Sequence, residues 1–514
     1  MVSIFSLRRC FLLIFVLNMT INGFCKDYLL TIGGGYAPSG NQASLEANVV
    51  FFQQVVRDRH TATTEHLIYF ADGFDKKDDL QVLIPKSKTD SPAIDFLNDV
   101  FDLNRDQITY RDHQVPNIRG GLNPSAVRKG FDEITEKLMA GDRLIVYVTG
   151  HGSAAKGNDP HNTSITCWDK RALSMRSFSE WLDHVPETVP VVMIMAQCYC
   201  GGFANTMFVD GDADKGLAEH LRAGFFAQRH DLPAAGCRPD IENDEEYSSY
   251  FWGAFMGRSR TGKPIEHVDC NGDNKISFAE AHAYAVVASQ TIDIPLKTSE
   301  AFLRKYSRIA GYEDSIESSE SETKQGSTSG PELLYISGTV DEIASKGTPD
   351  QRRMVIGLAN QLQIPLEADV SRVFLLNNEQ HDLYRQSRRS SRRGRGSRRR
   401  DLRAEIIEKW PEIANPNTWA KLDWLKADQS ELFLQQARQL PNFQAFQQSQ
   451  TDRKDLAEKS TVAELNEVKF RRLIYSLETI VYAQNLPFVA SPEEIEKYEA
   501  ILKIEGMLFD QTSN

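Results

Sequence analysis

Short apolar runs alternate with amphipathic segments over the first 300 positions of the chain. The runs are Tyr28–Ile32, His66–Ala71, Leu144–Gly152 and Val191–Gly202. Uninterrupted apolar runs of this length predict strands that are buried on both faces. Between them, Leu45, Val49, Phe52 and Val56 recur at helical spacing, as do Phe131, Ile134 and Leu138 ahead of a glycine at 141. Strands that alternate with helices predict an α/β fold with a mostly parallel sheet.

The second half of the chain has a different pattern. Residues 313–330 are acidic and serine-rich with almost no apolar content, which predicts a linker and a domain boundary. Amphipathic stretches from 331 to 514, such as FRRLIYSLETIVYAQ, predict a mainly helical C-terminal module. An arginine-rich run within it, residues 385–403, is expected to be a disordered loop. Binding to an anionic surface and proteolytic activation are its functional alternatives.

Composition, charge and the N-terminus narrow the class of protein. A length of 514 residues allows two or three domains, and 41% hydrophobic with 25% charged residues is ordinary for globular proteins. The net charge of −12 argues against nucleic acid as a partner. Residues 1–25 contain two arginines and then a short apolar stretch, which predicts a signal peptide, with an uncleaved anchor as the alternative. We therefore expect a secreted or periplasmic protein with no integral membrane span beyond the signal.

Two reactive side chains end two of the apolar runs. His151 closes the run LIVYVTGHG, and Cys198 follows VVMIMAQ. The carboxyl ends of parallel strands share one edge of a sheet, where open α/β folds place their ligand crevice. A thiol attacks a carbonyl as thiolate, and a nearby imidazole can take its proton and return it to the leaving amine. The pair predicts a cysteine nucleophile, although either residue alone is more often structural.

The motifs Thr149-Gly150-His151-Gly152-Ser153 and Ala196-Gln197-Cys198 resemble those of the clan CD cysteine peptidases, the caspase, legumain and gingipain superfamily. The resemblance extends over roughly residues 27–306 and is nearest to bacterial legumain-like or caspase-like proteins. It implies a caspase-hemoglobinase fold over 27–311, a three-layer αβα sandwich. It also implies a cysteine endopeptidase acting on a peptide or protein substrate, whose oxyanion is held by the backbone N–H groups of Gly152 and Cys198. By resemblance to legumain, the C-terminal module is expected to be an intramolecular inhibitor.

Substrate specificity stays open at this point. Caspases bind a substrate aspartate through an arginine in the loop after the first strand. Residues 32–50 of this chain contain neither arginine nor lysine. An aspartate preference is therefore in doubt, and no residue can be assigned to substrate binding.

A second constellation occupies residues 269–280. Oxygen-bearing side chains stand at positions one, three, five and nine of a twelve-residue EF-hand-like loop, with a backbone carbonyl at seven and glutamate at twelve. The predicted Ca²⁺ ligands are Asp269, Asn271, Asp273, Lys275 through its carbonyl, Ser277 and Glu280. The alternative is an acidic turn that caps a helix, with Ser277 and Glu280 as a capping box. No organic cofactor is expected.

Two further classes of function stay open beside the peptidase. The first is a catalytically inactive caspase-like protein that binds partners in a calcium-dependent way. The second is a thiol-disulfide oxidoreductase that uses Cys198 and Cys200, although the chain lacks a C-x-x-C motif there.

Overall fold

The computed structural model describes residues 26–84, 89–103, 107–220, 222–235, 246–311, 333–392, 397–427 and 429–510. The predicted signal peptide, 1–25, and the predicted linker, 313–330, lie outside the described residues.

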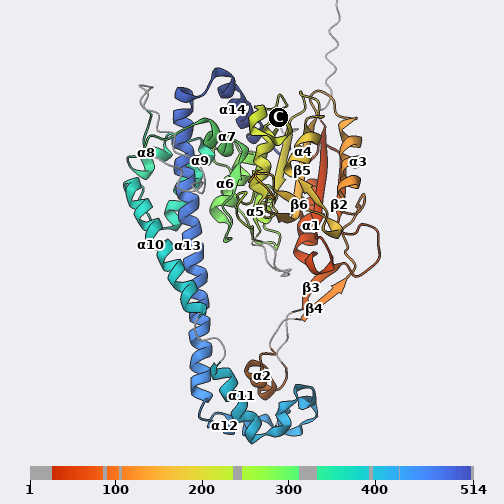
Figure 1. Ribbon diagram of the computed structural model, residues 1–514, viewed down its shortest axis with the longest axis vertical. Helices are drawn as coiled ribbons and strands as arrows, with labels where there is room; N and C mark the ends of the chain where they lie inside the picture. The colour runs from red at the N-terminus through yellow and green to blue at the C-terminus, as the bar shows by residue number, and fades with distance from the viewer. Residues whose placement is uncertain are drawn as a thin grey trace, which may run out of the picture.

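A mostly parallel sheet forms the centre of the N-terminal half (Figure 1). Its strand order is β10-β9-β8-β5-β1-β2, and all neighbours are parallel except β10 with β9. The strands are β1 (Asp27–Gly34), β2 (Thr63–Phe70), β5 (Arg143–Ser153), β8 (Val191–Met195), β9 (Arg222–Phe226) and β10 (Leu296–Lys297). Two short antiparallel strands, β6 (Ser164–Thr166) and β7 (Ala172–Ser174), extend the sheet beside the end of β5. The predicted α/β class with a mostly parallel sheet is confirmed.

Helices cover this sheet on both faces, since every residue of β1 and β8 is buried. One group, α1 (Ala43–Arg59) and α5 (Tyr247–Met256), packs Phe52 and Trp252 at 4.3 Å between ring centroids, with Tyr147 of β5 beside them. A second group, α3 (Pro124–Thr135) and α4 (Met175–Leu182), packs Phe131 against Phe178. The half is completed by α6 (Phe278–Ala288), α7 (Thr298–Tyr306) and the short 3₁₀ helices η1 (Pro38–Gly40), η2 (Trp168–Lys170), η3 (Cys200–Met207), η4 (Val209–Gly211) and η5 (Ala213–Lys215).

The C-terminal module is helical, as predicted. It contains α8 (Val340–Ala344), α9 (Pro349–Gln361), α10 (Val370–Arg392), α11 (Ser397–Lys409), η6 (Pro411–Ala414), η7 (Pro416–Lys421), η8 (Asp423–Leu425), α12 (Ser430–Ala437), α13 (Phe443–Val489) and α14 (Pro492–Glu505). With 47 residues, α13 is about 70 Å long. It pairs with α10 into a stalk that runs from the sheet domain to a distal lobe (Figure 1). No helix among the described residues has both the length and the apolar content to cross a bilayer.

The distal lobe contains residues 92–101 and the chain from α11 to the start of α13, so it is built from both halves of the sequence. The antiparallel pair β3 (Leu80–Ile84) and β4 (Gln107–Arg111) projects from the sheet domain, and α2 (Pro92–Phe101) lies between the two strands in sequence. This helix buries Leu97 and Phe101 against α11, α12 and the start of α13, and Phe101 meets Trp419 at 5.1 Å. The continuous 27–311 domain expected from the sequence is therefore interrupted by α2.

The module joins the sheet domain through buried polar contacts. Lys297, just ahead of α7, pairs with Asp350 of α9 at 2.8 Å and with Glu505 of α14 at 3.4 Å. At the other end of the sheet, Arg143 of β5 donates to the backbone carbonyls of Leu508 and Phe509, both at 2.7 Å. Charged groups buried at an interface this way are costly to expose singly, so we expect the two parts to unfold together.

One prediction for the module needs correction. The disordered loop expected at 385–403 is helical wherever the structure describes it, because α10 continues to Arg392 and α11 begins at Ser397. Arginine is among the better helix formers, so an arginine-rich composition is compatible with a helix as well as with a disordered loop. The start of α11 is also anchored in the distal lobe. Arg399 pairs with Asp102 at 2.5 Å, and the guanidinium carbon of Arg403 lies 4.4 Å from the centroid of the Phe101 ring.

Candidate active site

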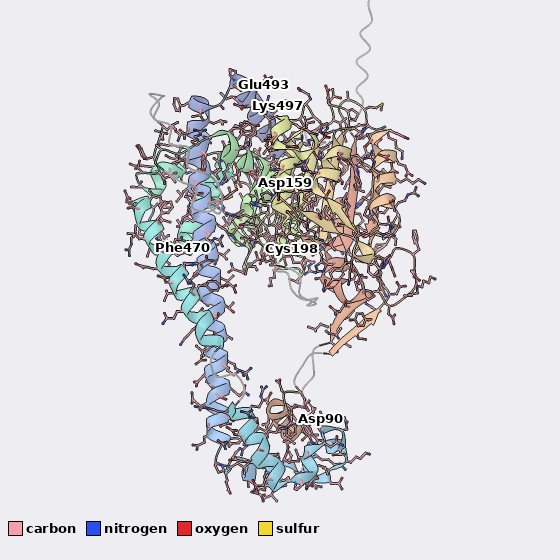
Figure 2. The ribbon with its side chains drawn as sticks, viewed as in Figure 1. Asp90, Asp159, Cys198, Phe470, Glu493 and Lys497 are labelled. Carbon is pink, nitrogen blue, oxygen red and sulfur yellow. The ribbon has the colours of Figure 1, made fainter. Side chains whose placement is uncertain are left out.

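The sheet register brings His151 and Cys198 to the same edge. Strands β5 and β8 are parallel neighbours, with Leu144 opposite Val191 and Val148 opposite Met195. The Ala196 N–H continues the ladder by donating to the Val148 carbonyl at 2.9 Å. Continued by three residues, this register sets position 151 beside position 198. Figure 2 shows Cys198 at the end of the sheet domain that faces the distal lobe, where Asp90 lies.

Gly152 makes the closest approach between the two segments. A Cβ added at this residue would lie 1.9 Å from the carbonyl oxygen of Cys198 and 2.9 Å from Cγ of Gln197. Only glycine fits where two backbones meet so closely. The His-Gly motif therefore has a packing reason in this chain: the glycine lets the histidine segment lie directly against the cysteine.

A tight turn follows the cysteine. Tyr199 has a φ of 60°, the left-handed conformation that residues with a Cβ seldom adopt. Its N–H donates to the Leu232 carbonyl at 3.1 Å, and its own carbonyl accepts from the Thr163 hydroxyl at 2.9 Å. The chain then enters η3 at Cys200. Strained turns of this kind cluster at functional sites, where they fix the direction of a side chain.

The imidazole of His151 is held from the loop after β1. Its Nε2 lies 2.7 Å from the Gly40 carbonyl oxygen and 3.0 Å from Oε1 of Gln42, and the Tyr36 ring packs edge-on at 5.1 Å. A carbonyl can only accept, so Nε2 carries the proton, and the neutral ring has Nδ1 as its basic nitrogen. Burial lowers the pKa of His151 below 6.5, opposed by the Gly40 hydrogen bond. The resting imidazole is therefore neutral near pH 7.

The Cys198 residue is 8% exposed, and it forms no disulfide. Its sulfur accepts the Ala234 N–H at 3.3 Å and lies 3.8 Å from the Ala234 carbonyl. Cys200 is fully buried and likewise forms no disulfide; its thiol donates to the Gln228 carbonyl at 3.4 Å, and burial raises its pKa. Of the two residues, only Cys198 is partly exposed, so a structural role suits Cys200 better than a reactive one.

A chain of contacts links the Cys198 loop to α13. Ala235, next to the residue that donates to Cys198, donates its own N–H to Oδ1 of Asp293 at 2.6 Å. The loop that carries Asp293 is in turn held by Arg472 of α13. This buried guanidinium donates all five of its N–H groups, to the carbonyls of Val286, Ser289, Thr291 and Asp293 and to the Thr291 hydroxyl, at 2.7 to 3.1 Å. Nothing in the sequence pattern pointed to a role for this residue near the site.

The EF-hand-like segment forms a compact loop ahead of α6. Asp269 accepts N–H groups from Asn271, Gly272 and Asn274 at 2.6 to 3.1 Å. Asn274, at position six of the motif, has a φ of 59°, the conformation that glycine usually supplies there. Ser277 and Glu280 form the capping box considered as the alternative, because each side chain bonds the other's backbone N–H. The loop geometry and the capping box thus coexist.

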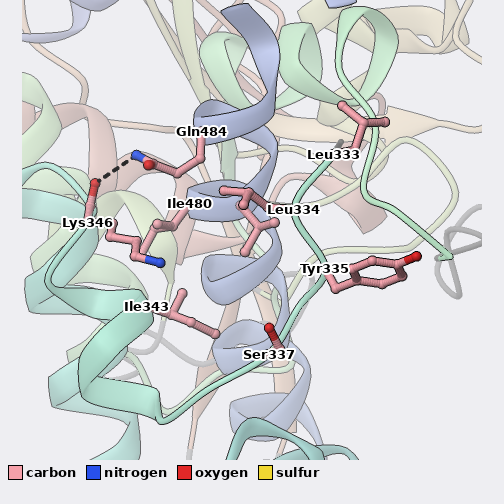
Figure 3. Close-up of a pocket in the computed structure, with 9 residues that line it drawn as sticks. Leu333, Leu334, Tyr335, Ser337, Ile343, Lys346, Ile480 and Gln484 are labelled. Carbon is pink, nitrogen blue, oxygen red and sulfur yellow. Dashed lines mark hydrogen bonds between the residues drawn. The ribbon is translucent and has the colours of Figure 1, made fainter. Parts of the chain in front are cut away.

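A separate cavity of about 260 Å³ lies in the C-terminal module, between the segment that leads into α8 and the end of α13 (Figure 3). Its lining is mainly apolar, with Leu334, Tyr335 and Ile343 facing Ile480. Gln484 closes one side by donating to the Lys346 carbonyl at 3.3 Å. None of the residues that line the cavity belongs to the sheet domain.

Comparisons with known proteins leave the family open. No family model matches the sequence, and no curated protein has significant similarity to it. Among solved structures, protein GSU0716 from Geobacter sulfurreducens is similar to 50% of this chain and 88% of its own, at 10% identity and a TM-score of 0.28. A likeness at that level carries no argument about function.

Proposed function

We propose that the chain is a cysteine endopeptidase of the caspase-hemoglobinase fold, with Cys198 as nucleophile and His151 as acid and base. The carrying observation is the shared register of β5 and β8, with the backbone of Gly152 against that of Cys198. The absence of a disulfide at Cys198 and the turn at Tyr199 also support it. The proposal keeps the expected oxyanion donors, the N–H groups of Gly152 and Cys198.

The chemistry follows from the state of the histidine. Because His151 is neutral at rest, it takes the Cys198 proton as the sulfur bonds to the scissile carbonyl carbon. The tetrahedral oxyanion then collapses, the C–N bond breaks, and the amine leaves with the proton from the imidazolium. Water, deprotonated by the same imidazole, attacks the thioester, releases the acid and returns the thiol. No step needs a metal or an organic cofactor.

The contacts of the C-terminal module favour a supporting role over the inhibitory one that legumain suggests. Arg472 of α13 donates hydrogen bonds to the loop that carries Asp293. Lys297, just ahead of α7, forms ion pairs with α9 and α14. On this proposal, removing the module would expose buried charges and abolish activity, whereas removing an inhibitor would raise it.

Calcium at residues 269–280 belongs to the same proposal. The bonding of Asp269 and the left-handed Asn274 give the loop the shape that an EF-hand uses. Isothermal titration with CaCl₂ should show one binding event in the wild type and none in Asp273→Ala. Equal binding by the two proteins would exclude these ligands.

The decisive assay for the activity uses a peptide library. Wild type, Cys198→Ala and the matched control Cys200→Ala are incubated with the library, and products are identified by mass spectrometry. We expect cleavage by wild type and Cys200→Ala and none by Cys198→Ala. Cleavage that survives in Cys198→Ala would refute the peptidase, and no cleavage by any of the three would favour the calcium-dependent binding protein.

A further inference from the structure

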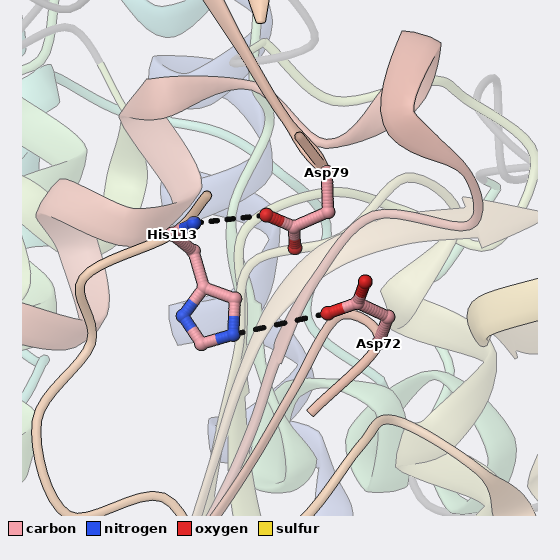
Figure 4. Close-up of side chains that lie close together, drawn as sticks. All are labelled: Asp72, Asp79 and His113. Atoms are coloured by element: carbon pink, nitrogen blue, oxygen red, sulfur yellow. Dashed lines mark hydrogen bonds and ion pairs between the residues drawn. The ribbon is translucent and has the colours of Figure 1, made fainter. Parts of the chain in front are cut away.

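A group of buried polar side chains lies near the dyad but takes no part in the proposed reaction. Asp72 follows β2, Asp79 precedes β3, and His113 follows β4 (Figure 4). One carboxylate oxygen from each aspartate and one ring nitrogen of His113 lie within 4.8 Å of one another. Ligands of an octahedral ion with bonds of about 2.1 Å are roughly 3.0 Å apart when adjacent and roughly 4.2 Å apart when opposite, so a shift of about 1 to 2 Å would bring all three onto one ion.

The group is enclosed rather than superficial. The side chains of His113 and Asp72 are 5% and 9% exposed, and Asp79 is fully buried. Gly73, between the two aspartates, has a φ of 84° and turns its carbonyl oxygen to within 2.9 Å of Nε2 of His113. This contact is a hydrogen bond from the Nε2 proton to the carbonyl oxygen, so an ion bound here would take the place of that proton and leave Nδ1 as the protonated nitrogen. Nε2 and the Gly73 oxygen would then be neighbouring ligands of the ion.

One oxygen of the buried Asp72 carboxylate has no hydrogen-bond partner. Its Oδ1 accepts no hydrogen bond and lies 3.9 Å from Nε2 of His113, too far for one. Asp79, by contrast, accepts hydrogen bonds from the backbone N–H of His113 at 2.9 Å and from the side-chain amide of Asn41 at 3.1 Å. Two carboxylates placed together out of water need a shared cation or a proton.

We propose that Asp72, Asp79 and His113 bind one divalent first-row metal ion, Zn²⁺ or Mn²⁺, with the Gly73 carbonyl as a fourth ligand. The donor set excludes calcium, which takes oxygen ligands alone, whereas zinc and manganese accept imidazole with carboxylates. Binding does not depend on the peptidase activity, and the site is separate from the loop at 269–280.

The site would also stiffen the support of His151. Asn41 donates its side-chain amide to the Asp79 carbonyl oxygen at 3.2 Å and accepts the Gly35 N–H at 2.9 Å. The adjacent residue, Gly40, supplies the carbonyl that holds His151. An ion on Asp79 therefore fixes one end of the loop that orients the imidazole.

The test is metal binding by the full chain after removal of bound ions with a chelator. Wild type, Asp72→Asn, His113→Gln and the control Asp75→Asn are dialysed against Zn²⁺ or Mn²⁺, with excess Ca²⁺ present, and bound metal is measured by mass spectrometry. Asp75 is on the same loop, with its side chain 47% exposed. We expect one equivalent in wild type and Asp75→Asn, and affinity at least tenfold weaker in the two site variants.

The proposal is overturned if wild type binds neither metal, or if both site variants bind as wild type does. Should one variant fail to fold, the other carries the comparison. Thermal unfolding gives a second measurement: either ion that binds should raise the Tm of wild type and Asp75→Asn alike. No change in the Tm of wild type with saturating Zn²⁺ and Mn²⁺ would equally overturn the site.

Discussion

Replacing Arg472 should destabilise the whole molecule, because this side chain connects α13 to the loop beneath the active site. In Arg472→Met, four buried carbonyl oxygens lose their donors, and Asp293 loses its nearby positive charge. Each unsatisfied buried carbonyl costs at least about 1 kcal/mol, and removal of one buried charged partner costs about 3 to 5 kcal/mol. The two figures agree on a loss of about 4 kcal/mol, or roughly 4 °C in Tm if the whole chain unfolds as one unit.

The neighbouring Arg471→Met is the matched control. Arg471 is on the same helix, but its side chain is 30% exposed and only 3.8 Å from Glu467, an arrangement worth less than about 1 kcal/mol. Chemical denaturation of both variants gives the free energies of unfolding. Arg472→Lys should recover part of the loss, because lysine keeps the charge but has three donors in place of five. If Arg472→Met is no less stable than Arg471→Met, the supporting role of α13 is wrong.

Three further outcomes are expected. His66 is partly buried, and this desolvation lowers its pKa to about 4, so its folded form resists protonation, and stability falls as the pH drops from 6.5 towards 4. Between pH 7 and 5 wild type should lose about 2 kcal/mol relative to His66→Gln in denaturation curves, and parallel curves would contradict this. Gly152→Ala, whose new Cβ would meet the Cys198 carbonyl, should lower kcat/KM at least tenfold. Gly120→Ala, with its nearest contact at 3.7 Å, should leave kcat/KM unchanged. Cys200→Ala should lose about 1 to 2 kcal/mol of stability and keep cleavage, since its thiol is fully buried; loss of cleavage without loss of stability would give it a part in the chemistry.

The central strands could be predicted because their burial leaves a strong pattern. Strands β1, β5 and β8 are buried on both faces over most of their length, so their central residues are apolar, and the runs in the sequence begin within one residue of the strands. The run from Val191 to Gly202 is too long, because β8 ends at Met195. The positions of His151 and Cys198 at one edge then follow from parallel pairing. The structure adds the register and the backbone contact at Gly152.

Long-range pairings left no such pattern. The pattern of α2 predicts an apolar face, but it does not predict that this face packs on Trp419, over 300 positions away. Arg472 follows another arginine in a helical stretch, and periodicity alone does not tell which one is buried. Asp72 and His113 are 41 positions apart and meet only through the β3–β4 pair, so no spacing rule identified them.

The reactivity of Cys198 tests the catalytic pair most directly, since it needs no substrate. Burial raises the pKa of Cys167 and Cys270 to about 12 and that of Cys200 as well, so these thiols should be slow to alkylate near neutral pH. Wild type and His151→Asn are treated with iodoacetamide from pH 5 to 9, and the labelled residue is identified by peptide mass spectrometry. The dyad predicts that, among these four thiols, Cys198 reacts fastest, and that its labelling near pH 7 slows at least tenfold in His151→Asn. Equal rates in the two proteins at every pH would contradict the pairing of thiol and imidazole.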